Sequence, residues 1–514
     1  MSPKRRTQQL RFLLQNLNYQ YESGRVGVLQ ALYALGLQLP VPIVNENLQL
    51  LLLPVVLRLV NDESKTCREH AAQVIQVLLR RAGAQELQQT TILLNSWWNA
   101  PIDPATNVFD YRLACTAAQV TLILVEARPE IIEKSRIIPD VVLPRTKSFI
   151  ETCCLKTSHS YEALVEDIFI DSAHVEVEEH SCWQVIFSVL DCMVQISDKF
   201  PKYVDHYLEE CDVFLQLLVN ELVVYPHPWV RLTTIQILSG YLKRSIGHRK
   251  ADTSSSSMIR PTQSLRWVDS QENLFQITTQ IIKLLTLPNL SHPLQLEILG
   301  ILPWLCARIF DMNQNTTLLA RDFETDEADD MILYGAGAKQ TSFGWIMTRL
   351  SYMVRAVSAQ AQSTIFKLFA AITQLLDASH VSDYLIHMLN ALVRVQQEQD
   401  NVKEKGDYLA NKSASELEDS PRFLANQVVE LLEKKIGSDV FVPKYTFVQQ
   451  KIHQLRLDRK TKRKQELVQY PERAARRKLH KNEQKKFGKQ AKKRKFAVLK
   501  GITCRSKRAN SSYS

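Results

Sequence analysis

Apolar residues in the first 440 positions of the chain recur at helical spacing. Sets that follow the i, i+3, i+4, i+7 pattern of one helix face include Ile365-Leu368-Phe369-Ile372, Leu385-Met388-Leu389-Leu392 and Leu274-Ile277-Ile281-Leu285. This spacing predicts amphipathic helices. Several segments carry a second apolar stripe, as Ile235, Ile237 and Leu238 do beside Leu232 and Leu242. Because such a helix is apolar on two sides, it needs a neighbour on each side.

Proline residues and short polar turns separate these helical segments. They occur as pairs, at Pro40/Pro42, Pro101/Pro104, Pro226/Pro228 and Pro288/Pro293. Short turns between helices predict antiparallel helical hairpins. Hairpins that each need a neighbour on both faces stack into an α-solenoid. The chain has only 14 Gly among its 514 residues, which favours helices over a turn-rich β architecture.

Three segments look alike, because each has a polar or proline-containing turn followed by a strongly apolar helix. They are Asn61–Arg81, Pro226–Leu242 and Ser291–Ala307. The stretch Pro228-Trp-Val-Arg231 resembles the start of the second helix of a HEAT repeat. The predicted fold class is therefore all-α, with an α-solenoid of HEAT- or armadillo-like hairpins over residues 1–440. The period is irregular, since loops of different length intervene.

Three interruptions of the helical pattern are predicted within the solenoid. Residues 166–181 mix acids, Val and His, and are compatible with a loop or a short strand. Residues 245–265 include four consecutive serines and predict a flexible loop. Residues 321–330 carry six acids in ten positions, which predicts a solvated loop because like charges repel.

The pattern changes near the C-terminus, where residues 441–514 form a second predicted region, a basic helical tail. From Lys444 onward apolar residues are sparse, and Lys, Arg, Gln, Glu and Ala, which favour helix, dominate. Pro471 divides the tail into two candidate helices, at about 444–469 and 472–487. A helix that is polar all round does not attach itself to a core. We therefore expect the tail to be partly ordered alone and ordered on a partner.

Charge separates the tail from the body of the protein. Residues 451–514 contain 23 Lys and Arg against 4 Asp and Glu, a net charge of +19. The whole chain has 64 Lys and Arg against 54 Asp and Glu, so residues 1–450 hold 41 against 50, a net charge of −9. A dense positive tail suits a polyanion, because each cation that meets a phosphate releases a counterion.

The basic residues of the tail form clusters that predict contact with nucleic-acid phosphates. The candidate nucleic-acid-binding residues are Arg459, Lys460, Lys462, Arg463, Lys464, Arg473, Arg476, Arg477, Lys478, Lys485, Lys486 and Lys489. Lys492, Lys493, Arg494 and Lys495 match a nuclear-localisation pattern, which is short and common. A solvated polar helix without a ligand is the alternative. Charge alone does not distinguish RNA from DNA, and no apolar face for a membrane surface is evident.

The chain lacks motifs for catalysis, cofactors or metals. It has no phosphate-binding loop, no G-x-S-x-G and no H-E-x-x-H, so we expect no enzymatic activity and no small-molecule substrate. The spacing of His174, His180, Cys182 and Cys192 matches no familiar zinc site, and residues 321–330 lack the glycine of a calcium loop. No metal and no cofactor are predicted. The most apolar run, residues 48–60, is too short for a membrane span and predicts a core helix.

Several stretches, taken in their order along the chain, resemble a known family. They are Leu17-Asn-Tyr19, Asn61-Asp-Glu-Ser-Lys-Thr-Cys67, His227-Pro-Trp-Val-Arg-Leu-Thr-Thr234, Asn426-Gln-Val-Val-Glu-Leu-Leu-Glu-Lys-Lys435 and Tyr470-Pro-Glu-Arg-Ala-Ala-Arg-Arg-Lys-Leu479. They are similar to the C-terminal region of the down-regulated-in-metastasis family, the large HEAT-repeat, small nucleolar RNA-associated component of the small-subunit processome. Members of that family are much longer than this chain.

The resemblance implies a non-catalytic ribosome-biogenesis scaffold in the nucleus and nucleolus. Its tail would bind pre-rRNA during 18S rRNA maturation, and its solenoid would bind other processome proteins. The alternative is a nuclear α-solenoid adaptor or transport protein whose basic tail serves only as an import signal. That alternative needs Lys492–Lys495 and no RNA contact.

Overall fold

The computed structural model describes residues 3–103, 108–166, 172–252, 267–287, 290–313, 341–398 and 420–472, together with part of 475–489. Within these residues one row of helices runs through the protein, and each member contacts the next. The row consists of α2 (Glu22–Gln38), α4 (Lys65–Arg81), α6 (Tyr111–Ala127), α9 (Ser172–Lys199), α12 (Pro228–Asp252), α14 (His292–Asn313), α17 (Ala359–Leu375) and α21 (Pro421–Ile436).

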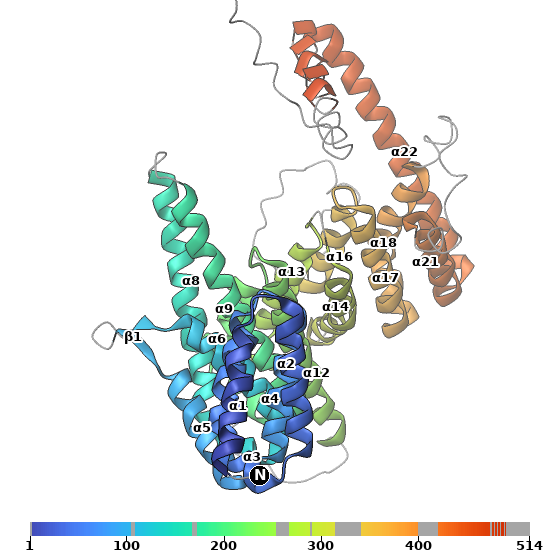
Figure 1. Ribbon diagram of the computed structural model, residues 1–514. Helices are drawn as coiled ribbons and strands as arrows, with labels where there is room; N and C mark the ends of the chain where they lie inside the picture. The colour runs from blue at the N-terminus through green and yellow to red at the C-terminus, as the bar shows by residue number, and fades with distance from the viewer. Residues whose placement is uncertain are drawn as a thin grey trace, which may run out of the picture.

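The other helices form a second layer beside this row. They are α1 (Pro3–Gln15), α3 (Val41–Asn61), α5 (Ala84–Trp98), α7 (Pro129–Ser135), α8 (Leu143–Glu166), α10 (Pro201–Glu210), α11 (Asp212–Leu217), α13 (Gln271–Leu284), α16 (Ser342–Met353), α18 (Ala378–Glu398) and α22 (Ser438–Gln469). Short helical turns are η1 (Asn16–Asn18), η2 (Ile138–Val142), η3 (Leu218–Leu222) and η4 (Trp267–Asp269). Figure 1 shows the array advancing from the blue N-terminal helices to the orange α21. The predicted α-solenoid is confirmed.

Side-chain hydrogen bonds between helices reveal the repeat length. They join Asn45 to Gly83, Asp205 to Arg244, and Gln30 to His70, which are 38, 39 and 40 positions apart. The bond from Arg81 to the carbonyl of Gly36 spans 45 positions. These separations agree with the roughly 40–47 residues of a HEAT or armadillo repeat. The packing is thus local in sequence, as stacked hairpins require.

An arginine near the start of a row helix closes the preceding turn in three repeats. Arg25 Nη1 donates to the carbonyls of the residues six and five positions before it, at 3.0 Å each. Arg68 makes the same pair of bonds at 2.7 and 3.0 Å, and Arg231 at 2.7 and 2.6 Å. Turn carbonyls that lie outside the helical ladder need such partners. Two of these arginines lie in the segments that the sequence identifies as alike.

Asp62 connects the first two repeats through a bidentate ion pair. Its carboxylate accepts from Arg25 Nε at 2.8 Å and Nη2 at 2.9 Å, and from the backbone N–H of Ser64 at 3.0 Å. Only 1% of the Asp62 side chain is exposed. A charge-assisted bidentate pair fixes both distance and orientation. It therefore sets how α2 meets the turn before α4.

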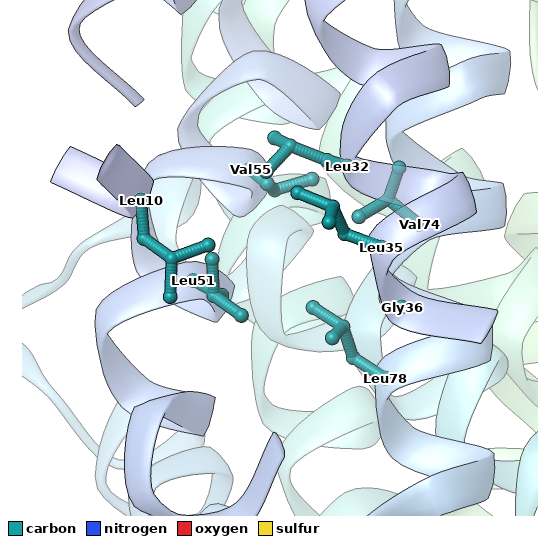
Figure 2. Close-up of a pocket in the computed structure, with 8 residues that line it drawn as sticks. All are labelled: Leu10, Leu32, Leu35, Gly36, Leu51, Val55, Val74 and Leu78. Atoms are coloured by element: carbon teal, nitrogen blue, oxygen red, sulfur yellow. The ribbon is translucent and has the colours of Figure 1, made fainter. Parts of the chain in front are cut away.

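A small apolar cavity marks the packing of the N-terminal helices. It measures about 10 Å³ and is lined by aliphatic side chains of α1 to α4, among them Leu10, Leu51 and Leu78, which Figure 2 shows pointing toward one another. Gly36 also lines it, and a Cβ there would lie 3.1 Å from the Val77 side chain. The missing side chain allows α2 to approach α4 closely.

Two helices of the described chain, α3 and α14, have the length and apolar composition of a membrane span. Both lie within the helical array. In α3 the side chains of Val44, Leu48 and Val55 are buried, and in α14 those of Ile298 and Leu305 are buried. Their apolar character thus serves packing in the solenoid. The run at residues 48–60 forms part of α3, which is consistent with the predicted core helix.

The structure departs from the sequence prediction in two places. A short antiparallel hairpin, β1 (Pro101–Asp103) and β2 (Val108–Phe109), follows α5 where a simple proline turn was expected. Residues 172–181 belong to α9, so the loop or strand predicted at 166–181 is wrong for them. No Gly or Pro occurs in that stretch, hence nothing in its sequence ends a helix. Residues 167–171 lie outside the described residues.

The other two predicted interruptions fall mostly outside the described residues. α12 continues to Asp252, so the first residues of the segment 245–265 are helical, and 253–265 are not described. The acidic segment 321–330 is also not described.

Replacing Asp62 by Asn should destabilise the first repeats. The isosteric amide keeps the shape but removes the buried negative charge opposite Arg25, and we expect the free energy of unfolding to fall by about 2–4 kcal/mol. Urea unfolding followed by circular dichroism measures this. Glu69→Gln is the matched control, since its ion pair with Lys65 is exposed and worth well under about 1 kcal/mol. Equal effects of the two changes would contradict the role of Asp62.

The contribution of Asp62 should disappear in acid. Burial acts to raise the pKa of Asp62, but the hydrogen bonds from Arg25 and Ser64 and the charges of Arg25 and Arg58 outweigh it and lower the pKa below 3.8. A lowered folded-state pKa stabilises the fold above the unfolded value and loses this effect as pH falls through the folded value. The stability difference between wild type and Asp62→Asn should therefore be constant above about pH 5 and shrink below pH 3.8. A difference unchanged down to pH 2.5 would argue against this assignment.

Candidate nucleic-acid interface

α22 is one continuous helix that crosses the predicted boundary at residue 440. Its first half packs on α18 and α21. Phe441, Val448 and Ile452 are buried, and Tyr445 packs beside them. These positions follow an i, i+4, i+7, i+11 stripe. The packed part of the chain thus extends to Ile452, about 12 residues beyond the boundary expected from composition.

A glycine turn and a lysine contact fix the start of α22. Gly437, with φ of 93°, occupies a backbone region that suits glycine and separates α21 from α22. The Lys444 amine donates to the carbonyl of Ser382 at 2.6 Å and to its hydroxyl at 2.8 Å. Together with the buried stripe, these contacts hold the base of α22 against α18.

The C-terminal part of α22 projects from the array, as Figure 1 shows, and the described side chains after Ile452 are exposed or half-buried. The candidate residues Arg459, Lys460, Lys462 and Lys464 are exposed in this projecting part. Arg456 is exposed as well and belongs with them, although the sequence prediction omitted it. The 17 residues that follow Ile452, up to Gln469, span about 25 Å at 1.5 Å per residue. Cations along this length face solvent without the body of the protein beside them.

Most of the described cations in the projecting part of α22 lie on one side of the helix. At 3.6 residues per turn, Arg456, Arg459, Lys460 and Lys464 fall within an arc of about 140°, and Lys462 lies outside it. The opposite strip contains Gln454, Leu457, Asp458, Thr461, Gln465 and Val468. The basic arc continues the direction of the buried stripe. A polyanion on this arc would therefore lie on the side of α22 that faces α18 and α21.

The second tail helix follows a break at the predicted proline. α22 ends at Gln469, and helical residues resume at Pro471 and recur to Lys489. In this part Arg476, Lys478, Lys485, Lys486 and Lys489 are exposed.

Some predicted site residues lie outside what the structure describes. The side chains of Arg463, Arg473 and Arg477 are among them, and so are all of Lys492, Lys493, Arg494 and Lys495. Their roles remain predictions.

Cys182 and Cys192, two of the residues considered as metal ligands, are buried within the helical array. Among the described residues, no group of three or more His, Cys, Asp or Glu side chains is arranged to hold a metal ion. Cys182 and Cys192 are buried in α9, and burial raises the pKa of the Cys192 thiol. A buried thiol with a raised pKa is a poor nucleophile and a poor metal ligand.

A family match covers the C-terminal part of the chain. The family described as "Small subunit processome component 20 homolog, C-terminal" matches residues 338–498, which include α16 to α22 and most of the basic tail. Residues 338–498 are thus similar to this family. The resemblance predicted from the sequence is confirmed.

A curated relative aligns over most of the chain. The "U3 small nucleolar RNA-associated protein 20" of Schizosaccharomyces pombe is 22% identical over 480 residues, which is 92% of this chain. The chain spans 16% of that relative's length.

Solved structures with a similar arrangement include helical proteins of other kinds. The crystal structure of Kap121p is 12% identical with a TM-score of 0.38, over 87% of this chain and 36% of that one. The structure of the TSC2 N-terminus is 10% identical with a TM-score of 0.32, over 86% of this chain and 99% of that one. At TM-scores below 0.5 these likenesses carry no conclusion about function.

Replacing Ile452 by Asp should release the base of α22. A carboxylate cannot be buried in this apolar contact without a partner, so the stripe should detach from α18 and α21. Hydrogen exchange of the amides between Phe441 and Ile452 should become at least tenfold faster. Leu457→Asp is the control, because Leu457 is 44% exposed and lies beyond the contact. If both variants exchange alike, the stripe does not hold the helix.

Proposed function

We propose that this chain is a non-catalytic scaffold segment of the small-subunit processome that acts in ribosome biogenesis. The family match at residues 338–498 supports the proposal that the chain is part of the small-subunit processome. The name of the Schizosaccharomyces pombe relative supports association with U3 small nucleolar RNA. The proposed location is the nucleolus. The solenoid offers long surfaces for processome proteins, because its core is formed locally and its faces stay accessible.

In this proposal the projecting tail contacts pre-rRNA. The observation that carries it is the exposed basic arc of α22, held at its base by a buried stripe and free beyond Ile452. Cations at spacings of three and four residues recur every turn, so successive side chains reach along one phosphate path. The contact is electrostatic and independent of sequence. Specific placement on 18S precursor would then come from the proteins bound by the solenoid.

The salt dependence of RNA binding tests the tail directly. With a fluorescein-labelled 20-nucleotide uridine RNA, log affinity should fall linearly with log salt concentration. Replacing Arg456, Arg459, Lys460 and Lys464 by Gln should reduce the steepness of that slope by about 3, since each single-strand phosphate contact contributes about 0.7. Fluorescence anisotropy between 50 and 300 mM KCl measures it.

The control variant removes four positive charges from the body of the protein instead of from α22. Lys65, Arg80, Lys202 and Lys283 are exposed on the body of the protein, and their replacement by Gln should leave the slope unchanged. A slope that changes equally in both variants would show that total charge, and not the arc, governs binding.

Crosslinking in cells tests the assignment to pre-rRNA. Reads from the wild-type chain should concentrate on the 18S precursor and its 5′ spacer, and they should fall in the variant that lacks the four cations of α22. Lys492–Lys495→Ala separates import from binding. Loss of nuclear entry in that variant, with no RNA crosslinks above background in the wild type, would favour the import-signal adaptor instead.

A further inference from the structure

A groove in the second layer lies well away from the basic tail along the chain. It runs between α5 on one side and the end of α7 with η2 on the other, and its volume is about 540 Å³. This volume falls within the roughly 300–1,000 Å³ of sites that bind small molecules or peptide side chains. The α5 wall extends from Ala84 to Asn95, about 16 Å of helix. An extended peptide of about five residues has this length.

The groove is lined by both apolar and polar side chains. Ile92 and Ile131 are among the apolar ones, and the Ile92 side chain is 64% exposed although it is aliphatic. Gln88 and Asn95 stand two turns apart on the α5 edge. Their amides carry both donors and acceptors, which is what the backbone of an extended peptide requires.

The opposite edge of the groove is cationic. Lys134 and Arg136 line it and are exposed, whereas Asp140 contributes one negative charge. The Arg136–Asp140 ion pair is long, at 3.6 Å, and both side chains are mostly exposed, so it neutralises Arg136 only weakly. The net positive edge and the apolar residues of the lining are together complementary to an aliphatic side chain flanked by carboxylates.

The backbone of this edge is irregular at the same place. Arg136 has φ of 52°, the left-handed conformation in which glycine is favoured, and η2 directly after it is a π-helical turn. Among the described residues, Arg136 is the one non-glycine with positive φ. Arg136 is the residue at which α7 ends, and its side chain lines the α7–η2 side of the groove.

From these observations we infer that the groove between α5 and α7–η2 binds an extended acidic peptide segment of a partner protein. An aliphatic side chain of the segment packs against Ile92. Its backbone is held by Gln88 and Asn95, and its carboxylates meet Lys134 and Arg136. This inference does not depend on RNA binding by the tail, which involves a different part of the chain.

Peptide selection tests the chemistry. Random hexapeptides displayed on phage are selected on the full chain and counter-selected on the double variant Lys134→Glu, Arg136→Glu. We expect enriched sequences that place Asp or Glu beside Leu, Ile, Val or Phe. Failure to enrich any sequence over the counter-selection, or enrichment of basic peptides, would overturn the inference.

Three variants then test the geometry with the most enriched peptide, by fluorescence anisotropy. Ile92→Gln should weaken binding at least tenfold without unfolding the protein, because the side chain is mostly exposed. Arg136→Gly should weaken it at least fivefold while the melting temperature stays equal or rises, since glycine suits the backbone there. Lys65→Glu, on an exposed part of α4, should change neither.

The outcome of the Arg136→Gly variant separates function from structure. Unchanged peptide affinity would mean that the arginine serves only the turn, and the inference would fail.

Competition by the uridine RNA separates the two classes of ligand. Displacement of the peptide by RNA in the full chain with Arg456, Arg459, Lys460 and Lys464 replaced by Gln would assign the groove to nucleic acid and would also overturn the inference.

Discussion

In three repeats of the solenoid an arginine satisfies the carbonyls of the turn before its helix. A helical hairpin leaves carbonyl groups at the turn without helical partners, and these groups need another donor. Arg25, Arg68 and Arg231 each supply two N–H···O bonds to those carbonyls. At the first turn, Asp62 holds Arg25 in place and joins the neighbouring repeat. Repeats can then stack because their turns are already satisfied.

Local apolar patterns explain why the fold class follows from the sequence. Ile365, Leu368 and Phe369 lie on one face of α17, and all three are buried. Proline turns place the helix starts, as at Pro228 of α12. Residues 172–181 escaped prediction because alternating acids and Val resemble neither a turn nor a clear helix face. The hairpin of β1 and β2 escaped because a few residues of strand carry no periodic signal.

The tail shows what the sequence could and could not predict about a site. Charge density identified the cations of α22, and Pro471 identified the end of that helix. The stripe of Phe441, Tyr445, Val448 and Ile452 was present in the sequence, but composition averaged over the tail concealed four apolar residues among many charged ones. The groove between α5 and α7–η2 was beyond prediction, since it depends on the distance between two helices and on the left-handed backbone of one arginine.

The anchored base of α22 has a mechanical consequence. A stiff helix that is fixed at one end by Phe441 to Ile452 and free for about 25 Å beyond acts as a lever arm. A tilt of about 10° at its base moves the tip at Gln469 by about 4 Å, close to the rise of one nucleotide along a strand. Small changes in the packing of α18 and α21 against α22 are therefore amplified at the cations. Whatever binds the last repeats of the solenoid can in this way shift the positions of these cations.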